Sequence, residues 1–302
     1  MTSTVQPNSP STAGHALLVR ILVGYDGSLP ASAAIEVGAS LFPRVRAWIG
    51  HLWTPPFASE GLRRRLWKGS AAINEFVEAI EREGSGEARR LAAMGVTLAV
   101  AAGWEAEALV ERAYGGEGLQ FTELIEKLDP DVALVGSRGL DGANAMLGSV
   151  SDMVVHYASR PVLVVPHPLL IAERAAVIDG PVIVGWDGSA GAQAALTAVA
   201  RLFPTRKAQL ASVDQDAEHT AATSGYEVIT LASEGGRAGS ARATADTLAR
   251  HARRSQAALI VVGSRGRSAV REILLGSVAV ATLHHAHRPI MVVPHAAPAE
   301  EA

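Results

Sequence analysis

The stretch GSRGLDGANAMLGSVSDMVVHYASRPVLVVP occupies residues 136–166, and residues 263–294 read GSRGRSAVREILLGSVAVATLHHAHRPIMVVP. Each stretch has an upstream companion, VGYDGS at residues 23–28 and VGWDGS at residues 184–189. A repeat of this length indicates two homologous domains. In both copies a glycine-rich turn runs into a helical pattern, and a helix that begins in this way can present its first backbone N–H groups to an anion.

The length of 302 residues fits two domains of roughly 150 residues each. We expect a disordered tail over residues 1–14, because this segment is polar and has neither a basic start nor an apolar run. The expected domains are residues 15–167 and a shortened second copy over residues 181–302. A linker over residues 168–180 joins them.

The composition excludes several classes of protein. A net charge of −3 gives no basis for an extended nucleic-acid surface, and the absence of cysteine excludes disulfides and thiolate chemistry. No apolar stretch reaches the ~18 residues that would indicate a membrane span. We therefore expect a cytoplasmic protein with neither a nucleic-acid nor a membrane partner.

Short apolar runs alternate with helical patterns in both halves, which predicts an α/β fold with a parallel sheet and right-handed crossovers. In the second half only about a dozen residues separate strands two and three, so the long second helix of the first half is expected to be missing there. The expected strands are 17–24, 47–53, 96–101, 132–136 and 162–165, then 182–185, 209–213, 228–231, 258–263 and 290–293. The expected helices of the first half are 30–41, 71–94, 105–114, 121–128 and 143–157.

Ligands of open parallel sheets bind beyond the carboxyl ends of the strands, where the strand order reverses. If the first strand is central, Asp26 and the turn at Gly136 face one crevice. A carboxylate there can accept hydrogen bonds from ribose hydroxyls, and the hydroxyls of Ser149 and Ser277 can donate. Another interpretation is purely structural, because glycines often only turn the chain and Asp-Gly-Ser is a good helix cap.

Several catalytic classes lack their sequence patterns. The chain contains no G-x4-G-K-[ST], no G-x-G-x-x-G and no G-x-S-x-G, which argues against Walker-type NTPases, dinucleotide oxidoreductases and serine hydrolases. The histidines at 284, 285 and 287 suit a helix C-terminus better than a metal site, and no protein-held metal is expected. Since no general base or catalytic lysine accompanies the glycine turns, we expect no enzyme, or at most slow hydrolysis of a bound ligand.

The repeated stretches resemble the universal stress protein family, whose signature is G-x2-G-x9-G-[ST]. The resemblance implies two five-stranded parallel sheets in the order 3-2-1-4-5, paired through their fifth strands as a pseudo-dimer. It also implies binding of ATP with Mg²⁺ and a role as a sensor or regulator in a stress response. The second copy matches the signature at Gly263, Gly266, Gly276 and Ser277.

The first copy differs from the signature by one residue. Gly136 and Gly139 are in place, but only eight residues precede Gly148 and Ser149. Because the second copy keeps the full spacing, we expect it to bind ATP more tightly.

Further residues follow from the resemblance. Asp26 and Asp187 match the family's aspartate near the ribose, and Leu52 and Val213 match the strand that offers its backbone to adenine. Ser151 stands where the family often has a serine or threonine, whereas the second copy has alanine.

Two other functions stay open at this stage. One is a non-nucleotide dimerisation and interaction module of the same fold, and the other is a slow ATP hydrolase. A homodimer is also possible in addition to the intrachain pseudo-dimer.

Overall fold

The structure is a computed structural model, and it describes most of the chain outside the N-terminal tail and several loops. The predicted tail over residues 1–14 lies outside the described residues. The described residues are 18–55, 73–137, 147–214, 223, 225–233, 239–266 and 275–295.

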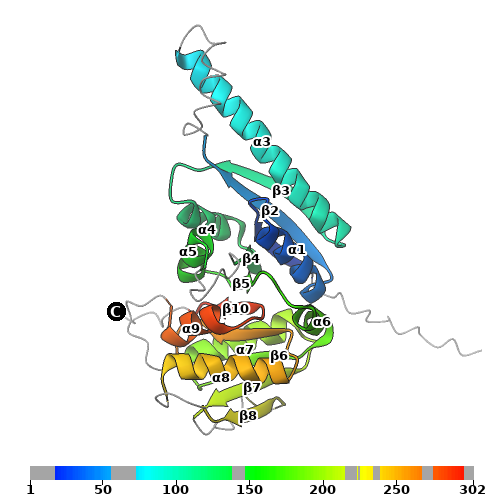
Figure 1. Cartoon of the computed structure of the whole chain (residues 1–302), viewed down its shortest axis with the longest axis vertical. Coiled ribbons are helices and arrows are strands. Elements are labelled where there is room, and N and C mark those ends of the chain that lie inside the picture. The colour runs from blue at the N-terminus through cyan, green and yellow to red at the C-terminus, as the bar shows by residue number, and fades with distance from the viewer. Residues whose placement is uncertain are drawn as a thin grey trace, which may run out of the picture.

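The strands form a single ten-stranded sheet in the order β3-β2-β1-β4-β5-β10-β9-β6-β7-β8 (Figure 1). Within each half the neighbouring strands are parallel, and both halves have the predicted order 3-2-1-4-5. The strands are β1 Val19–Gly24, β2 Val45–Trp53, β3 Glu105–Arg112, β4 Val132–Gly136, β5 Val162–Val165, β6 Val182–Gly185, β7 Ala208–Val213, β8 Glu227–Leu231, β9 Leu259–Gly263 and β10 Ile290–Val293.

The two halves join through their fifth strands, as the sequence predicts. β5 pairs with β10 in antiparallel register, with Leu163 opposite Met291. Both residues are fully buried. An unpaired apolar edge strand invites aggregation, and this pairing removes one such edge from each half.

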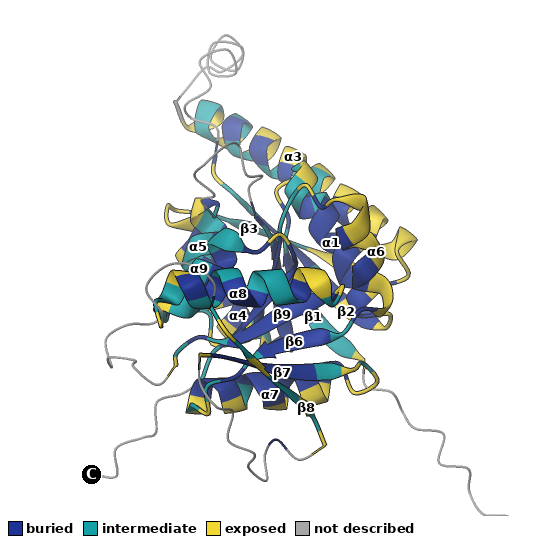
Figure 2. Cartoon of the chain, turned by 60° about the horizontal axis from the view of Figure 1, so that its bottom comes forward, coloured by how far each residue is buried: buried dark blue, intermediate teal, exposed yellow. Residues whose placement is uncertain are grey.

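Helices cover both faces of the sheet. One face carries α1, α6 and α7, and the other carries α4, α5, α8 and α9 (Figures 1 and 2). Figure 2 shows the buried strands between these layers and the exposed residues on the outer sides of the helices. The helices are α1 Leu29–Leu41, α3 Ile73–Ala101, α4 Glu117–Leu128, α5 Ser149–Tyr157, α6 Ile171–Asp179, α7 Ala190–Leu202, α8 Ala241–Arg254 and α9 Ser277–His285.

The segment between the halves is itself helical. α6 falls within the predicted linker, residues 168–180, and it packs against α1. Its residues Ala176 and Val177 are buried in the core on that face of the sheet. The linker therefore forms part of the packed structure.

The predicted third strand of the first half, residues 96–101, is wrong, and so is the predicted helix over 105–114. The segment 96–101 is the last part of α3, and β3 begins at Glu105. The prediction took this apolar run as a buried strand, but Leu98 and Val100 face solvent, with 41% and 55% of their surface exposed. β3 is an edge strand with four charged residues, so it lacks the apolar run of a buried strand.

The buried positions of α3 explain why this segment is a helix. They recur every three or four residues, which is the spacing of one helix face. The residues at the end of this stripe are small, and a Cβ at Gly95 would lie 2.7 Å from Ile49 and 2.8 Å from Tyr25. The buried positions are Ile80, Gly84, Ala88, Ala92, Gly95 and Ala99.

The second half lacks a counterpart of α3, as predicted. Only residues 214–226 lie between β7 and β8, whereas α3 alone has 29 residues. The described part of this connection contains no helix comparable to α3.

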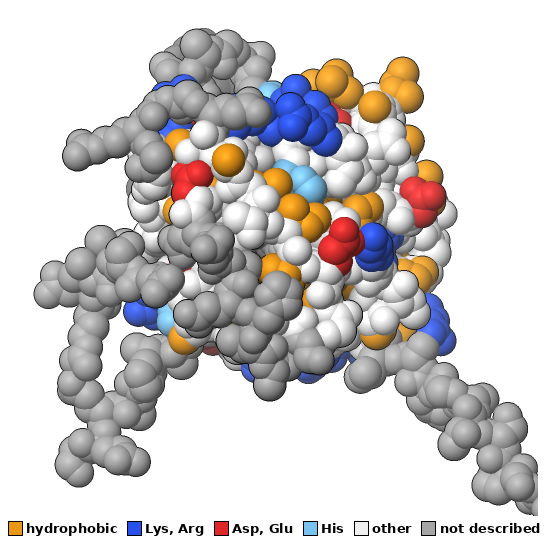
Figure 3. Space-filling model, turned by 90° about the horizontal axis from the view of Figure 1, so that it is seen from below, with side chains coloured by type: hydrophobic (Ala, Val, Ile, Leu, Met, Phe, Trp, Pro, Cys, Tyr) orange, Lys and Arg blue, Asp and Glu red, His pale blue; other side chains and the backbone are white. Residues whose placement is uncertain are grey.

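The surface seen from below carries both kinds of charge. Figure 3 shows the described basic side chains of this face in separate groups, with acidic side chains among them. This distribution agrees with the net charge of −3. None of the described helices is long and apolar enough to cross a membrane.

Equivalent residues of the two halves meet at the junction. Phe42 follows α1 and Phe203 follows α7, and their ring centroids lie 5.0 Å apart. Close by in sequence, Arg201 of α7 donates a hydrogen bond of 2.6 Å to the carboxylate of Asp131, which precedes β4. Asp131 also accepts the backbone N–H of Arg20 at 2.9 Å. The junction thus combines strand pairing, an aromatic contact and an ion pair.

We predict that Asp131 makes the stability of the protein depend on acidic pH. Burial alone would raise the pKa of Asp131, but the hydrogen bonds and charges of Arg20 and Arg201 outweigh burial and lower the pKa. Stability from a group with a lowered folded-state pKa is present above its unfolded pKa of about 3.9 and is lost as the pH falls through the folded value. In urea unfolding below about pH 4, Asp131→Asn should lose less stability with falling pH than the wild type.

The control is Glu87→Gln on the exposed side of α3, which should retain the wild-type pH dependence. The same acid-induced loss in Asp131→Asn as in the wild type would show that the ion pair does not contribute in this way.

Candidate functional site

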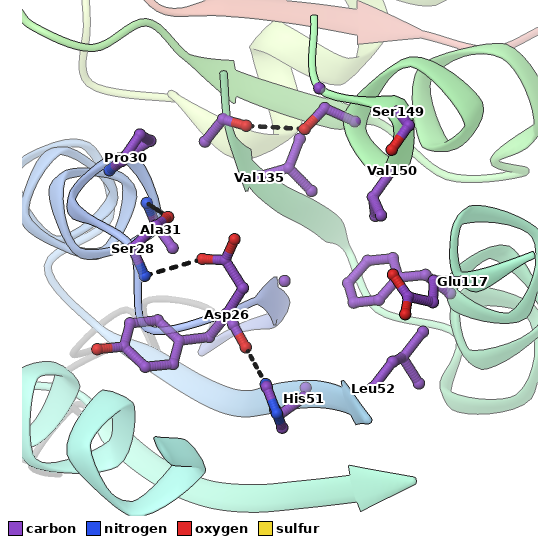
Figure 4. Close-up of a pocket in the computed structure, with 17 residues that line it drawn as sticks. Asp26, Ser28, Pro30, Ala31, His51, Leu52, Glu117, Val135, Ser149 and Val150 are labelled. Atoms are coloured by element: carbon purple, nitrogen blue, oxygen red, sulfur yellow. Dashed lines mark hydrogen bonds between the residues drawn. The ribbon is translucent and has the colours of Figure 1, made fainter. Parts of the chain in front are cut away.

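A cavity of 390 Å³ opens at the carboxyl ends of β1, β2 and β4 in the first half. Its volume lies in the lower part of the range for small-molecule pockets, about 300–1,000 Å³. All of its walls come from the first half (Figure 4). The lining residues are Gly24, Tyr25, Asp26, Ser28, Pro30, Ala31, Gly50, His51, Leu52, Glu117, Phe121, Val135, Gly136, Gly148, Ser149, Val150 and Ser151.

One wall is the turn between β1 and α1. Ser28 is the N-cap of α1, and its hydroxyl accepts the backbone N–H of Ala31. Asp26 accepts the backbone N–H of Ser28 at 2.9 Å, and its side chain is exposed at the cavity (Figure 4). Gly27 between them has a φ of +80°, which favours glycine. Both Ser28 and Asp26 therefore stabilise the turn, and Asp26 also exposes its side chain to the cavity.

The opposite wall is the N-terminus of α5. Gly148 is its N-cap and provides no side-chain cap, and Ser149 is the first helical residue. The first N–H groups of a helix have no partner within the helix, and the helix dipole favours an anion there. The hydroxyl of Ser151 donates to the carbonyl oxygen of Gly136 at 2.8 Å, so it ties α5 to the end of β4.

The floor of the cavity is apolar. Leu52 and Val135 contribute to it, together with the ring of Phe121. A Cβ at Gly24 or at Gly50 would lie only 3.3 Å from that ring, so the two glycines let Phe121 lie close to β1 and β2. A flat aromatic group such as a nucleobase suits a surface of this kind.

Beside this floor His51 is buried, and its Nδ1 lies 2.7 Å from the carbonyl oxygen of Tyr25. This contact connects β2 with the turn that carries Asp26. His51 thus supports one wall of the cavity.

The structure brings the predicted residues of the first half together. Gly139 lies outside the described residues. All the others line the cavity, namely Asp26, Leu52, Gly136, Gly148, Ser149 and Ser151.

Glu117 and Phe121 line the cavity as well, and the sequence interpretation missed them. They belong to α4, whose N-terminal turn lies beside that of α5, since a Cβ at Gly118 would lie 2.5 Å from the Cβ of Met153. A signal was present, because Gly115 and Gly116 precede a regular helical pattern. The wrong assignment of residues 105–114 as a helix concealed that α4 begins at the carboxyl edge of the sheet.

The second half repeats the arrangement with a different turn. Asp187 accepts the backbone N–H of Ser189 at 3.0 Å, as Asp26 does from Ser28. A Cβ at Gly266 would lie 2.9 Å from the carboxylate of Asp187. The backbone N–H of Gly276, the N-cap of α9, donates to the carbonyl oxygen of Ser264 at 2.6 Å. The glycine turn of this half therefore lies against both Asp187 and the start of α9.

The first half lacks the hydrogen bond between its glycine turn and its helix N-cap. Ser137 and Gly148 are the equivalents of Ser264 and Gly276, both are described, and no backbone hydrogen bond joins them. Asp26 is exposed, whereas Asp187 is partly buried. The other predicted residues of the second half occupy the expected places, with Val213 at the end of β7, Gly263 at the end of β9 and Ser277 as the first residue of α9.

A further contact supports the turn of the second half. The Arg265 guanidinium donates to the carbonyl oxygen of His295 at 3.1 Å. Burial and the charge of Arg265 lower the pKa of His295.

Among the described residues, no group of three or more histidine, cysteine or acidic residues could hold a metal ion.

A scan against family models matches the description "Universal stress protein family" over residues 19–166 and 241–294. These ranges include more than half of the chain and cover both glycine signatures as well as the turn at Asp26. The chain belongs to the universal stress protein family. No curated protein sequence matches the chain at a significant level.

Two solved structures that span most of the chain have the same fold. A universal stress protein from Archaeoglobus fulgidus DSM 4304 matches with a TM-score of 0.66 at 19% identity, over 92% of this chain and 98% of that chain. A functionally unknown protein from Pseudomonas aeruginosa PAO1 matches with a TM-score of 0.51 at 14% identity, over 92% of each chain. A family member from Arabidopsis thaliana with AMP bound matches 49% of this chain and 91% of its own length, at 18% identity and a TM-score of 0.33.

We predict that Ser151 contributes to stability through its bond to Gly136. Ser151→Ala should lower the free energy of unfolding by about 1 kcal/mol, the usual net value of one hydrogen bond. Ser149→Ala on the same turn is the control, because its side chain is exposed and its loss should change stability by less than about 0.5 kcal/mol. Urea unfolding measures both, and equal losses in the two variants would contradict the assignment.

Proposed function

We propose that this chain binds an adenine nucleotide in the cavity of the first half, as ATP with Mg²⁺, and acts as a sensor or regulator in a stress response. The observation that carries the proposal is the cavity itself, which combines Asp26, an apolar floor and the N-terminus of α5 at one place. It lies where the strand order of the first half reverses, with β1 between β2 and β4. Ligands of open parallel sheets bind at such points.

Each part of a nucleotide has a matching group in the cavity. The carboxylate of Asp26 can accept hydrogen bonds from ribose hydroxyls. The floor formed by Leu52, Phe121 and Val135 suits the base, and backbone groups at the end of β2 can hydrogen-bond its edge. The N–H groups at the start of α5, with the hydroxyl of Ser149, can bind phosphate oxygens.

Mg²⁺ fits this proposal as part of the ligand. The described lining residues include two carboxylates and no lysine or arginine. A triphosphate needs a positive partner, and two carboxylates alone do not form a cation site. The cation would therefore enter with the phosphates, and Glu117, which lies across the cavity from Asp26, is the residue that would face it.

The proposal assigns the nucleotide to the first half, although the signature spacing favoured the second. In the second half the turn of residues 264–266 already occupies the space between Asp187 and Gly276. The N–H of Gly276 has a carbonyl partner, and the carboxylate of Asp187 contacts the turn. These contacts would have to change before a phosphate could enter.

Calorimetric titration with Mg²⁺ and ATP tests the proposal. We predict one nucleotide per chain. Asp26→Ala should weaken binding about tenfold or more, because a hydrogen bond to a charged group contributes about 1.5–3 kcal/mol. Asp187→Ala is the matched control and should bind like the wild type. A stoichiometry of two, or a loss of binding only in Asp187→Ala, would contradict the assignment to the first half.

Measurements on the same wild-type protein distinguish the two other candidate functions. No heat of binding and no change in Tm with millimolar ATP would favour the interaction module. Continuous phosphate release from bound ATP would favour the slow hydrolase, whereas we propose binding without such turnover.

A further inference from the structure

Glu117 is an acidic residue in the cavity that no part of the family signature predicts. It is the first residue of α4 and follows the N-cap Gly116, which provides no side-chain cap. The hydroxyl of Thr54, just after β2, donates to the Glu117 carboxylate at 3.3 Å. Figure 4 shows Glu117 on the same side of the cavity as Leu52 and Val150, across from Asp26.

Two helix N-termini converge at Glu117. The next residue, Gly118, lies against the first turn of α5, where a Cβ would be 2.5 Å from the Cβ of Met153 and 3.5 Å from the Cα of Val150. The partial positive charges of both helices therefore act on the same corner of the cavity. Glu117 places a carboxylate in this corner, beside the place where the phosphates of a nucleotide would lie.

Among the described residues that line the cavity, no cationic side chain offsets this charge. Among its described lining residues Asp26 and Glu117 carry the formal charges at neutral pH, and neither lysine nor arginine is present. Like charges in a partly solvated site repel each other, and the repulsion grows with each charge that is added. Glu117 would therefore repel metal-free polyphosphate, and the repulsion would increase with the number of phosphate charges.

We propose that Glu117 determines the charge state in which a nucleotide is accepted, so that the first half selects the divalent-cation complex over the free polyphosphate. This inference rests on the proposed function, because it concerns the same cavity. Glu117 acts as a specificity residue through its charge. A bound cation reduces the ligand's negative charge, which weakens the repulsion by Glu117, and the cation itself attracts the Glu117 carboxylate.

The test is a titration of wild-type protein, Glu117→Gln and Glu123→Gln with adenosine, AMP, ADP and ATP, each in EDTA and in Mg²⁺. Glutamine keeps the size of the side chain and an oxygen that can accept from Thr54. Glu123 is exposed on α4 and does not line the cavity, so its substitution removes the same charge from the same helix.

In EDTA, Glu117→Gln should bind ATP about tenfold more tightly than the wild type, AMP about threefold more tightly, and adenosine equally well. In Mg²⁺ the gain for ATP should disappear or reverse. Glu123→Gln should stay within about twofold of the wild type for every ligand.

Two results would overturn the inference while leaving the proposed function intact. In one, Glu117→Gln weakens adenosine and the nucleotides alike, which would make Glu117 a direct contact of the nucleoside. In the other, Glu117→Gln and Glu123→Gln have the same effect. If the wild type binds none of the ligands, the proposed function itself fails, and this outcome is distinct from both.

Discussion

Strand β1 lies between β2 and β4, and this placement determines where a ligand can bind. Its residues Ile21, Leu22 and Val23 are fully buried, so the strand needs a helix layer on each face. The chain meets this need by leading α1 to one face and α4 and α5 to the other. The connections therefore diverge at the carboxyl ends of β1 and β4, and the space between them is the cavity. The strand order thus determines the position of the cavity, and the side chains at its walls determine its chemistry.

The two halves have the same strand order but differ in their helices and in the surroundings of their aspartates. The first half has the long helix α3 over β2 and β3. Its cavity has Asp26 on one wall, and Glu117 lies on the other wall beside the N-terminus of α5. The second half loses that helix, and its glycine turn lies against Asp187 and Gly276. Strand pairing between β5 and β10, with Phe42 and Phe203 in contact, holds both halves in one body. A duplicated domain can thus keep its architecture while the described surroundings of the two equivalent aspartates, Asp26 and Asp187, differ.

The sequence predicts the most buried strands best. β4, β5 and β10 begin and end at the predicted residues, because a short β-branched run buried on both faces has few alternatives. The prediction of β3 was wrong because an edge strand beside a helix needs little apolar surface. The apolar run that was assigned to this strand belongs to α3, which packs through its small residues and leaves Leu98 and Val100 exposed. Asp26, Gly148 and Ser149 could be predicted because they follow strands or open helices at fixed positions in the repeat.

Glu117 and the difference between the halves could not be predicted in this way. Glu117 reaches the cavity only because α4 packs against α5, which is a contact between segments far apart in sequence. The spacing of the signature also says nothing about whether a turn closes on its own aspartate, as residues 264–266 do. Such features depend on packing between elements, and single-sequence patterns describe each element by itself.

We propose that the first half alone holds the nucleotide. The most direct measurement is a crystal structure grown with Mg²⁺ and a non-hydrolysable ATP analogue. We predict density for the analogue between Asp26, Leu52 and the N-terminus of α5, with the turn of residues 264–266 still against Asp187. Density for the nucleotide beside Asp187 and Gly276, with the cavity of the first half empty, would contradict this account.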